Sequence, residues 1–251
     1  TYLPFITDQY LFNCLERLHT AYEGTKTKMD LAKFYSNKID GIKLGFDVIF
    51  NKMSEQEVVM AEIQRQIDKT VNNAIGHFHE ELLGGLNGLE YFKVGNEYDL
   101  KTPDNLVFAE VKNKHNTMNS SSSKATFEKL EKFAEEHDQA TAYLVQILAE
   151  RSQDQLWIRR NKKKEILSQH SRVRIISADK FYEKFTGDPH AFKKVCDALP
   201  KATNDFLKSK PATKRPDNTQ LFNELEQRAL SNNVDILTQL LNDNFDTYAG
   251  F

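Results

Sequence analysis

The chain has 251 residues, with 34 Lys and Arg against 36 Asp and Glu and a formal net charge of −2. This length can bury a full hydrophobic core, in one large domain or in one domain with helical additions, so no disulfide or zinc scaffold is required. The near-neutral charge excludes a uniformly basic coat for nonspecific nucleic-acid binding, which needs clustered Lys and Arg.

The two cysteines, Cys14 and Cys196, are far apart and lack ligand-type spacing. We therefore expect neither a structural bridge nor a metal site from them, and a reducing cytoplasm as the setting. No stretch approaches the ~20 apolar residues of a membrane span, and the first residues lack the basic region of a signal peptide. The sequence predicts a soluble cytoplasmic protein with no membrane partner.

The first third of the chain has helical periodicity. Apolar residues predict a helix over 8–23, capped by Thr7 or Asp8, and another over 29–36. Residues 37–53 fit either a strand or the start of a helix. A long helical pattern then begins at Ser54, which forms a capping-box pattern with Glu57, and ends near the glycines at 84–85.

After these glycines the period changes to that of strands. Short strands are expected over 89–94 and 97–100, followed by a TPDN turn and an apolar strand over 106–113. A polar loop over 114–123 leads to an amphipathic helix over 124–136 and a nearly continuous apolar strand over 141–148, which predicts a parallel strand-helix-strand unit.

The last part of the chain extends the sheet and then returns to helices. Strands are expected over 156–159 and 173–177, and helices over 178–185, 189–199, 218–230 and about 233–243. Pro200 is expected to end or kink the second of these helices, and 201–208 to continue it in the second case. Residues 208–218 have the composition of a linker.

Candidate catalytic residues are concentrated in the strand expected over 106–113. Glu110 and Lys112 are two apart, so their side chains point to one face with the Val111 carbonyl between them. A hairpin that pairs Lys101 with Leu106 places Asp99 opposite Phe108 and diagonal to Glu110, roughly 7–8 Å away at the backbone. Two carboxylates, a carbonyl and water are the oxygen ligands that Mg²⁺ prefers, and a neighbouring lysine can assist an attacking water.

A second acid, Asp104, follows Pro103 in the same stretch and could be taken for the metal ligand. It sits at the expected turn, however, and six strand residues of ~3.3 Å each would separate it from Glu110 by roughly 20 Å. Asp99 is therefore the preferred acid.

Asp99, ten intervening residues, and then Glu110-Val111-Lys112 resemble the PD-(D/E)xK nuclease superfamily. The runs IGHFHEELLGGL and DLKTPDNLVFAEVKNKHNTMNSSSSKATFEKL resemble more closely the type II restriction endonucleases that cut GGNCC. The resemblance covers residues ~70–150 well and the remainder loosely. Tyr98 stands where the superfamily's proline would precede Asp99.

This resemblance implies an α/β restriction-endonuclease-like core, a central mixed sheet flanked by helices, with additional N- and C-terminal helices. It divides the chain into an N-terminal helical region (1–70), a nuclease core (71–185) and a C-terminal helical region (186–251), within one compact domain. It further implies a prokaryotic enzyme that hydrolyses double-stranded DNA with Mg²⁺ and leaves 5′-phosphate ends. The expected partners are a second copy of the chain in a homodimer and a cognate DNA methyltransferase.

Further side chains before and after the hairpin have two interpretations each. Glu80 occupies the position of a helical acid that helps to hold metal or water in related nucleases, but it could be a surface glutamate, and Glu81 competes for the role. His77 and His79 point in different directions on a helix and are not expected to bind metal. Gln146 is either near the site or bonded to a backbone group.

The polar loop after the catalytic strand is the first candidate DNA contact, and the alternative is a solvated helix cap. Its DNA-binding candidates are Lys114, His115, Asn116, Asn119 and Ser120.

The basic segment 157–174 is the second candidate, and there Arg159, Arg160 and Lys162 are proposed to contact DNA because Arg pairs bidentately with guanine. An ordinary solvated hairpin is the alternative, and Trp157 fits either the core or a stacking platform. Two rival functions remain: a junction-resolving or repair nuclease of the same superfamily, and a non-catalytic DNA-binding protein.

Overall fold

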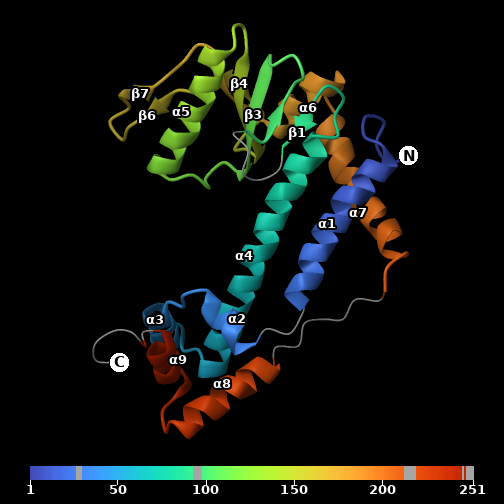
Figure 1. The fold of residues 1–251 in the computed structure, drawn as a ribbon. Helices are drawn as coiled ribbons and strands as arrows, with labels where there is room; N and C mark the ends of the chain where they lie inside the picture. The colour runs from blue at the N-terminus through green and yellow to red at the C-terminus, as the bar shows by residue number, and fades with distance from the viewer. Residues whose placement is uncertain (27–29, 93–97, 212–218, 245, 247–251) are drawn as a thin grey trace. The chain divides into compact units, whose positions relative to one another are not determined.

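The computed structural model of the chain describes residues 1–26, 30–92, 98–211, 219–244 and 246 (Figure 1). Its helices are α1 (Asp8–Lys26), α2 (Leu31–Ser36), α3 (Gly41–Asn51), α4 (Glu55–Leu83), α5 (Ser120–Glu136), α6 (Ala178–Thr186), α7 (Ala191–Leu207), α8 (Thr219–Ser231) and α9 (Ile236–Asn244). Its strands are β1 (Glu90–Tyr91), β2 (Leu100–Lys101), β3 (Val107–Lys114), β4 (Thr141–Leu148), β5 (Asp154–Leu156), β6 (Arg159–Arg160), β7 (Ile166–Ser168) and β8 (Val173–Ser177).

The chain forms two compact units. The sheet unit comprises Thr1–Leu18 and Ala74–Pro211, and the helical unit comprises His19–Asn73 and Ala212–Phe251. The first residues and α7 therefore belong with the sheet. The three consecutive regions expected from the sequence stay a prediction about domain organisation.

A six-stranded mixed sheet forms the centre of the sheet unit, in the order β1-β2-β3-β4-β8-β5. Strands β3, β4 and β8 are parallel to one another, whereas β1, β2 and β5 pair antiparallel. The predicted parallel β3-α5-β4 unit is confirmed, and so is the coarser expectation of a central mixed sheet flanked by helices. No helix in the described ranges is long and apolar enough to cross a membrane.

The apolar run of β4 is explained by cover on both faces of the sheet. Ala142 and Leu144 pack into a cluster with the buried face of α5, while Tyr143 and Val145 pack into a cluster with Phe181 of α6. Successive strand residues point to opposite faces, so alternation between polar and apolar residues is lost when both are buried.

Helix α5 begins at Ser120, four residues before the predicted start. The Asn119 side chain accepts a hydrogen bond from the Ser122 N–H at 2.9 Å, which satisfies a free donor of the first turn and allows the serines to be helical. The four apolar residues predicted to share a face are all buried: Phe127, Leu130, Phe133 and Ala134.

The helical unit resolves the open choice at 37–53 in favour of a helix. Asp40 caps α3 by accepting from the Lys43 N–H at 3.0 Å. The capping box at the start of α4 is confirmed, since Ser54 N–H donates to Glu57 at 2.7 Å and Glu57 N–H donates to the Ser54 hydroxyl at 3.3 Å.

Two expectations near the end of the sheet unit need correction or refinement. The strand predicted over 156–159 is wrong as one element: β5 ends at Leu156, and β6 pairs with β7 in a separate two-stranded sheet. Trp157 between them turns into the core, where its ring packs against Phe127 at 5.3 Å. Pro200 lies inside α7, which continues to Leu207.

Candidate active site

The β2–β3 hairpin positions the acids, and its register differs from the prediction. Leu100 pairs with Ala109 and Lys101 with Phe108, so the predicted Lys101–Leu106 pair is wrong. The turn is closed one residue later on each strand, by the Thr102 N–H donating to the Val107 carbonyl at 3.0 Å. Leu106 lies in the turn and is 43% exposed.

Asp104 has a structural role in this turn. Its carboxylate accepts hydrogen bonds from the Thr102 hydroxyl at 2.5 Å and the Leu106 N–H at 3.0 Å, and Asn105 beside it has a positive φ of 59°. The acid next to Pro103 therefore fixes the hairpin loop, as expected for a residue at a turn.

The shifted register brings Asp99 beside Glu110 and Val111. The Asp99 N–H donates to the Ala109 carbonyl at 3.2 Å, and its Oδ2 accepts from the Val111 N–H at 2.8 Å. The N–H and C=O of a residue in an antiparallel ladder point to the same side, so the Val111 carbonyl also points toward Asp99. This corrected register places the two acids closer together than the diagonal arrangement would.

Each carboxylate oxygen of Glu110 has a lysine nearby, and the side chain is only 8% exposed. Lys112 Nζ is 3.7 Å from its Oε2, and Lys129 Nζ of α5 donates to its Oε1. Burial raises the pKa of Glu110, the negative charge of Asp99 raises it further, and the two lysines oppose this shift. The two lysines thus favour the charged form of this carboxylate, whereas its burial and Asp99 disfavour it.

Lys129 is a site residue that the sequence analysis missed. It lies directly before Leu130 and four residues before Phe133, so it is at the edge of the buried face of α5. Helical periodicity alone gives such a position no sign of function. The signal that could have found it is the parallel β3-α5-β4 unit, which packs α5 over the face that carries Glu110.

Glu80 lies near the end of α4, on the side of the helix that faces the candidate site. Its side chain is 15% exposed and its Oε2 is 3.0 Å from His77 Nδ1. Burial raises the pKa of Glu80, Asp99 raises it further, and His77 and Lys112 oppose the shift. The structure thus places Glu80 close enough to Asp99 and Lys112 for their charges to act on it.

Glu81 and His79 are engaged elsewhere. Glu81 Oε2 accepts from Arg17 Nε at 2.8 Å. Burial lowers the pKa of His79 to about 4, so this ring is neutral at physiological pH. The choice between the two glutamates therefore favours Glu80 as the member of the site.

Gln146 lies on β4 directly opposite Lys112 and is 5% exposed. Its Oε1 accepts from Gln153 Nε2 at 3.5 Å. Since laterally paired residues point to the same face of a sheet, its amide lies on the face that carries Glu110 and Lys112. The structure favours the interpretation that places Gln146 near the site.

The polar loop after β3 is tied down at several points. The His115 N–H donates to the Leu148 carbonyl at 3.1 Å, and its Nε2 is 3.5 Å from Glu150. Lys114 and Asn116 are exposed. Asn119 caps α5, so the helix-cap interpretation holds for that residue.

The basic residues of segment 157–174 include some that are bonded within the protein and others that are exposed to solvent. Arg159 is 9% exposed, and its guanidinium donates to the hydroxyls of Ser123 and Ser168 and to the Ser120 carbonyl. Arg174 pairs with Asp154 at 2.6 Å. The exposed cations lie around the β6–β7 turn: Arg160, Lys162, Lys163 and Lys164.

The bonds of Arg159 to Ser120 and Ser123 join the β6–β7 hairpin to the start of α5. This start directly follows the polar loop, so the two groups of DNA-binding candidates lie next to each other, although Ser120 and Arg159 are 39 residues apart in sequence.

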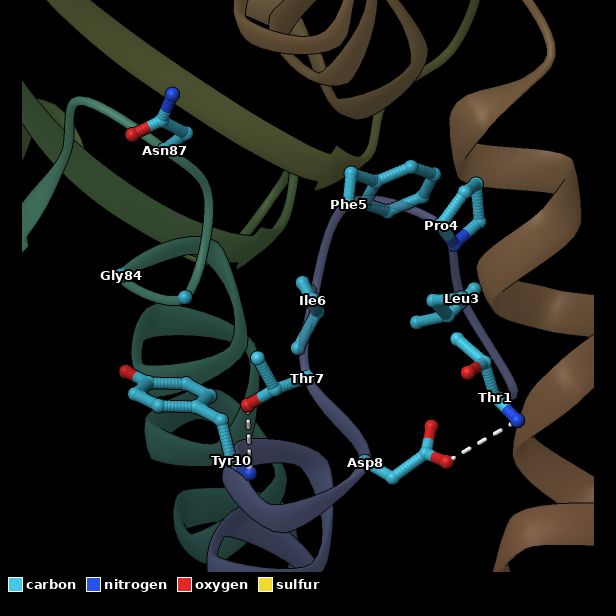
Figure 2. Close-up of a pocket in the computed structure, with 11 residues that line it drawn as sticks. Thr1, Leu3, Pro4, Phe5, Ile6, Thr7, Asp8, Tyr10, Gly84 and Asn87 are labelled. Carbon is cyan, nitrogen blue, oxygen red and sulfur yellow. Dashed lines mark hydrogen bonds and ion pairs between the residues drawn. The ribbon is translucent and has the colours of Figure 1, made fainter.

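A hollow of about 690 Å³ lies between the N-terminal segment and the end of α4 (Figure 2). The acidic and basic residues of the candidate site do not line it: Glu80, Asp99, Glu110, Lys112 and Lys129. Asp8, its only lining carboxylate, accepts from the Tyr2 N–H at 2.8 Å and pairs with the Thr1 amine at 3.2 Å. We assign no chemistry to this hollow.

The candidate site brings into one region three carboxylates, a carbonyl and two lysines, Lys112 and Lys129. These oxygens are the hard donors that suit Mg²⁺. Glu110 is buried and Glu80 is partly buried, and the pKa of each is raised, so a divalent cation beside them would offset their negative charge. No three His, Cys, Asp or Glu side chains within the described ranges are grouped closely enough to hold an ion as they stand.

A model of the Eco47II restriction endonuclease family matches residues 3–208, which include all the site residues described above. The chain belongs to this family. It is 40% identical over 250 residues to the type II restriction enzyme Sau96I of Staphylococcus aureus, covering 97% of this chain and 95% of the relative. It is 31% identical over 217 residues to the type II restriction enzyme Eco47II of Escherichia coli, covering 82% and 88%. The predicted class, a type II restriction endonuclease, is confirmed.

Proposed function

We propose that this restriction endonuclease has a PD-(D/E)xK core and cuts both strands of intact double-stranded DNA at GGNCC in a Mg²⁺-dependent reaction. The observation that carries the proposal is the convergence of Glu80, Asp99, Glu110 and Lys112 from α4, the β2–β3 hairpin and β3. The recognition sequence rests on the family resemblance of residues ~70–150.

Asp99, Glu110 and the Val111 carbonyl would hold the Mg²⁺, with Glu80 as a helical acid that holds metal or water. The bound ion would supply positive charge beside the scissile phosphate. The hydrogen bond from the Val111 N–H to Asp99 supports this ligand set, because it fixes the Asp99 carboxylate beside Val111.

Lys112 is the residue that acts on the nucleophile. Its ammonium, 3.7 Å from Glu110, is placed to orient a water for in-line attack on the phosphorus and to stabilise negative charge on the phosphate. The water adds to phosphorus as the bond to the 3′ oxygen breaks, and the products carry 5′-phosphate ends.

The DNA contacts would come from the polar loop and the β6–β7 turn. Lys114, His115, Asn116 and Ser120 are placed to contact the backbone near the cut, and Arg160 and Lys162 to contact phosphates or bases. Arg159 would act chiefly by joining the hairpin to α5. We further propose a homodimer, a cognate DNA methyltransferase as counterpart and a cytoplasmic location.

The proposal is tested by digesting phage DNA with the purified chain in Mg²⁺ or EDTA and sequencing the ends. We expect discrete fragments with cuts at GGNCC in Mg²⁺ alone. Asp99→Asn should reduce the rate at least ~100-fold, whereas Asp104→Asn, a matched change in the turn of the same hairpin, should leave most activity.

Two results would contradict the proposal. Cleavage of branched or damaged DNA without cutting of intact duplex would indicate a junction-resolving or repair nuclease. Binding of DNA without Mg²⁺-dependent cutting of any substrate would indicate a non-catalytic protein. If Asp99→Asn cut as fast as the unchanged chain, the site assignment would be wrong even if the function held.

A further inference from the structure

Helix α3 of the helical unit carries a large exposed apolar face. Its members recur at i, i+4, i+7 and i+8, and their exposures are 60%, 53%, 69% and 76% for Ile42, Phe46, Ile49 and Phe50. The rings of Phe46 and Phe50 stack with centroids 5.6 Å apart. We call these four residues the outer face of α3.

The opposite face of α3 already serves the core. Leu44 is buried, Val48 packs against the same cluster, and a Cβ at Gly41 would lie 2.6 Å from Leu241 of α9. Helix α3 therefore has two apolar faces, with the ion pair between Lys43 and Asp47 on the surface beside them. Within the described ranges, α9 covers one side and the outer face is open.

The exposed area is large enough for a specific contact. Aromatic side chains bury roughly 150–250 Å² each and isoleucine somewhat less, so two of each that are half to three-quarters exposed offer on the order of 400–500 Å². The largest apolar patch on a typical monomer is roughly 300–600 Å² and is often functional. Two such faces together reach about 1,000 Å², the lower bound of a biological interface.

Gly45 is compatible with the close approach of a partner helix to this face. It lies between Ile42 and Ile49 on the helix surface, and a Cβ there would meet nothing within 4 Å. Glycine is unfavourable inside a helix, and at this position no contact with the described part of the chain requires it. A small residue beside an apolar face lets the backbone of another helix approach closely.

We propose that the outer face of α3 packs against the outer face of α3 in a second copy of this chain, around a two-fold axis. A face without charged members can pack against itself, as an isologous contact requires. This inference rests on the proposed function for its biological reason, because cutting both strands of a symmetric site uses two active sites, and the described residues provide one per chain.

The experiment measures the mass of the full chain by sedimentation velocity from about 1 to 100 μM without DNA. We expect a reversible dimer. Phe50→Asp should weaken association at least about tenfold, because it places a charge within the buried contact. Leu230→Asp is the matched control: Leu230 is 70% exposed on α8 of the same unit, and the dimer should persist.

Gly45→Ala provides a readout that does not depend on a disruptive charge. At concentrations where the chain is monomeric, the alanine should raise the melting temperature, because it is the better helix former. At higher concentrations the added methyl should weaken the dimer. A higher melting temperature together with a weaker dimer requires a partner backbone near Gly45. An effect on helix stability alone would raise the melting temperature and leave the dimer unchanged.

The proposal is overturned if the chain stays monomeric throughout, or if Phe50→Asp and Gly45→Ala both leave its dimer unchanged. Cleavage measured on the same preparations separates this inference from the proposed function. A dimer that depends on α3 but cuts no DNA would contradict the function alone, and a monomer in solution that cuts GGNCC would contradict the α3 contact alone.

Discussion

Lys129→Met offers a sharp test of the site, because Lys129 and a metal ion would compete for the same carboxylate. Lys129 donates to Glu110 Oε1, and Glu110 is almost fully buried. Removing the lysine leaves a buried negative charge with Lys112 as its remaining cation, 3.7 Å away. The variant should therefore be less stable without metal and should bind Mg²⁺ more tightly.

The expected loss of stability depends on the burial of Glu110 and on Lys112, the cation that remains beside it. Breaking a fully buried ion pair costs about 3–5 kcal/mol. Lys129 is 32% exposed and Lys112 stays in place, so we expect a loss of about 1–2 kcal/mol in EDTA, between the exposed and buried cases. The same free energy should appear as metal affinity, which corresponds to a half-saturating Mg²⁺ concentration about tenfold lower.

Two assays measure this effect. Urea unfolding in EDTA gives the free energy of unfolding, and the cleavage rate against Mg²⁺ concentration gives the half-saturating value. Lys132→Met is the control, because Lys132 is on the same helix and pairs with Glu136 at an exposed position. The reasoning is refuted if Lys129→Met cuts slowly even at saturating Mg²⁺ with an unchanged half-saturating concentration, since Lys129 would then act on the DNA.

Three further predictions concern the fold, the pH dependence and the DNA contacts. Gly84→Ala should lower the free energy of unfolding by roughly 1–3 kcal/mol, because the added Cβ would lie 2.4 Å from the Cβ of Tyr91 on β1. Gly76→Ala should raise it by about 0.5–1 kcal/mol, because a Cβ there meets nothing within 4 Å. Urea unfolding measures both changes. The pKa of Glu80 is raised in the folded chain, so its contribution to stability is present below its unfolded value and is lost as pH rises through the folded value. Glu80→Gln should thus be more stable than the unchanged chain at pH 8 without metal, with a difference that vanishes toward pH 4 in thermal melts, and it should cut DNA more slowly. Arg160→Ala should weaken binding to all duplexes and reduce the slope of log affinity against log salt by about 1, while Arg159→Ala should chiefly lower stability, because its guanidinium is bonded within the protein.

Local periodicity predicted the elements whose buried faces can be read from the spacing of their apolar residues. The bounds of β4 and the buried face of α5 follow from patterns of period 2 and 3.6, because burial on those faces leaves no tolerance for polar residues. The capping box of Ser54 and Glu57 was readable for a similar reason, since its hydrogen bonds join residues three apart.

Features that depend on tertiary contacts could not be predicted from local periodicity. The hairpin register depends on which residues close the turn, and both the predicted and the observed loops have even length, so the alternation pattern permits either. The side chains of Arg159 and Asn119 have the composition of DNA contacts, yet their bonds to α5 decide their role. Lys129 reaches Glu110 only because α5 packs over β3.

The short turn between β2 and β3 has a consequence for the tolerance of this enzyme to change. Surface turns usually accept insertions and deletions, because they carry few buried contacts. Here a single added residue, with a turn of even length kept, would pair Asp99 with Ala109 or Val111, whose side chains point to the other face. Two added residues can extend the hairpin by one pair and keep Asp99 opposite Glu110. Among active enzymes the loop around Asp104 should therefore tolerate changes of sequence, and changes of length by an even number of residues, more readily than changes by an odd number, and a library of loop lengths would divide by parity into cutting and non-cutting variants.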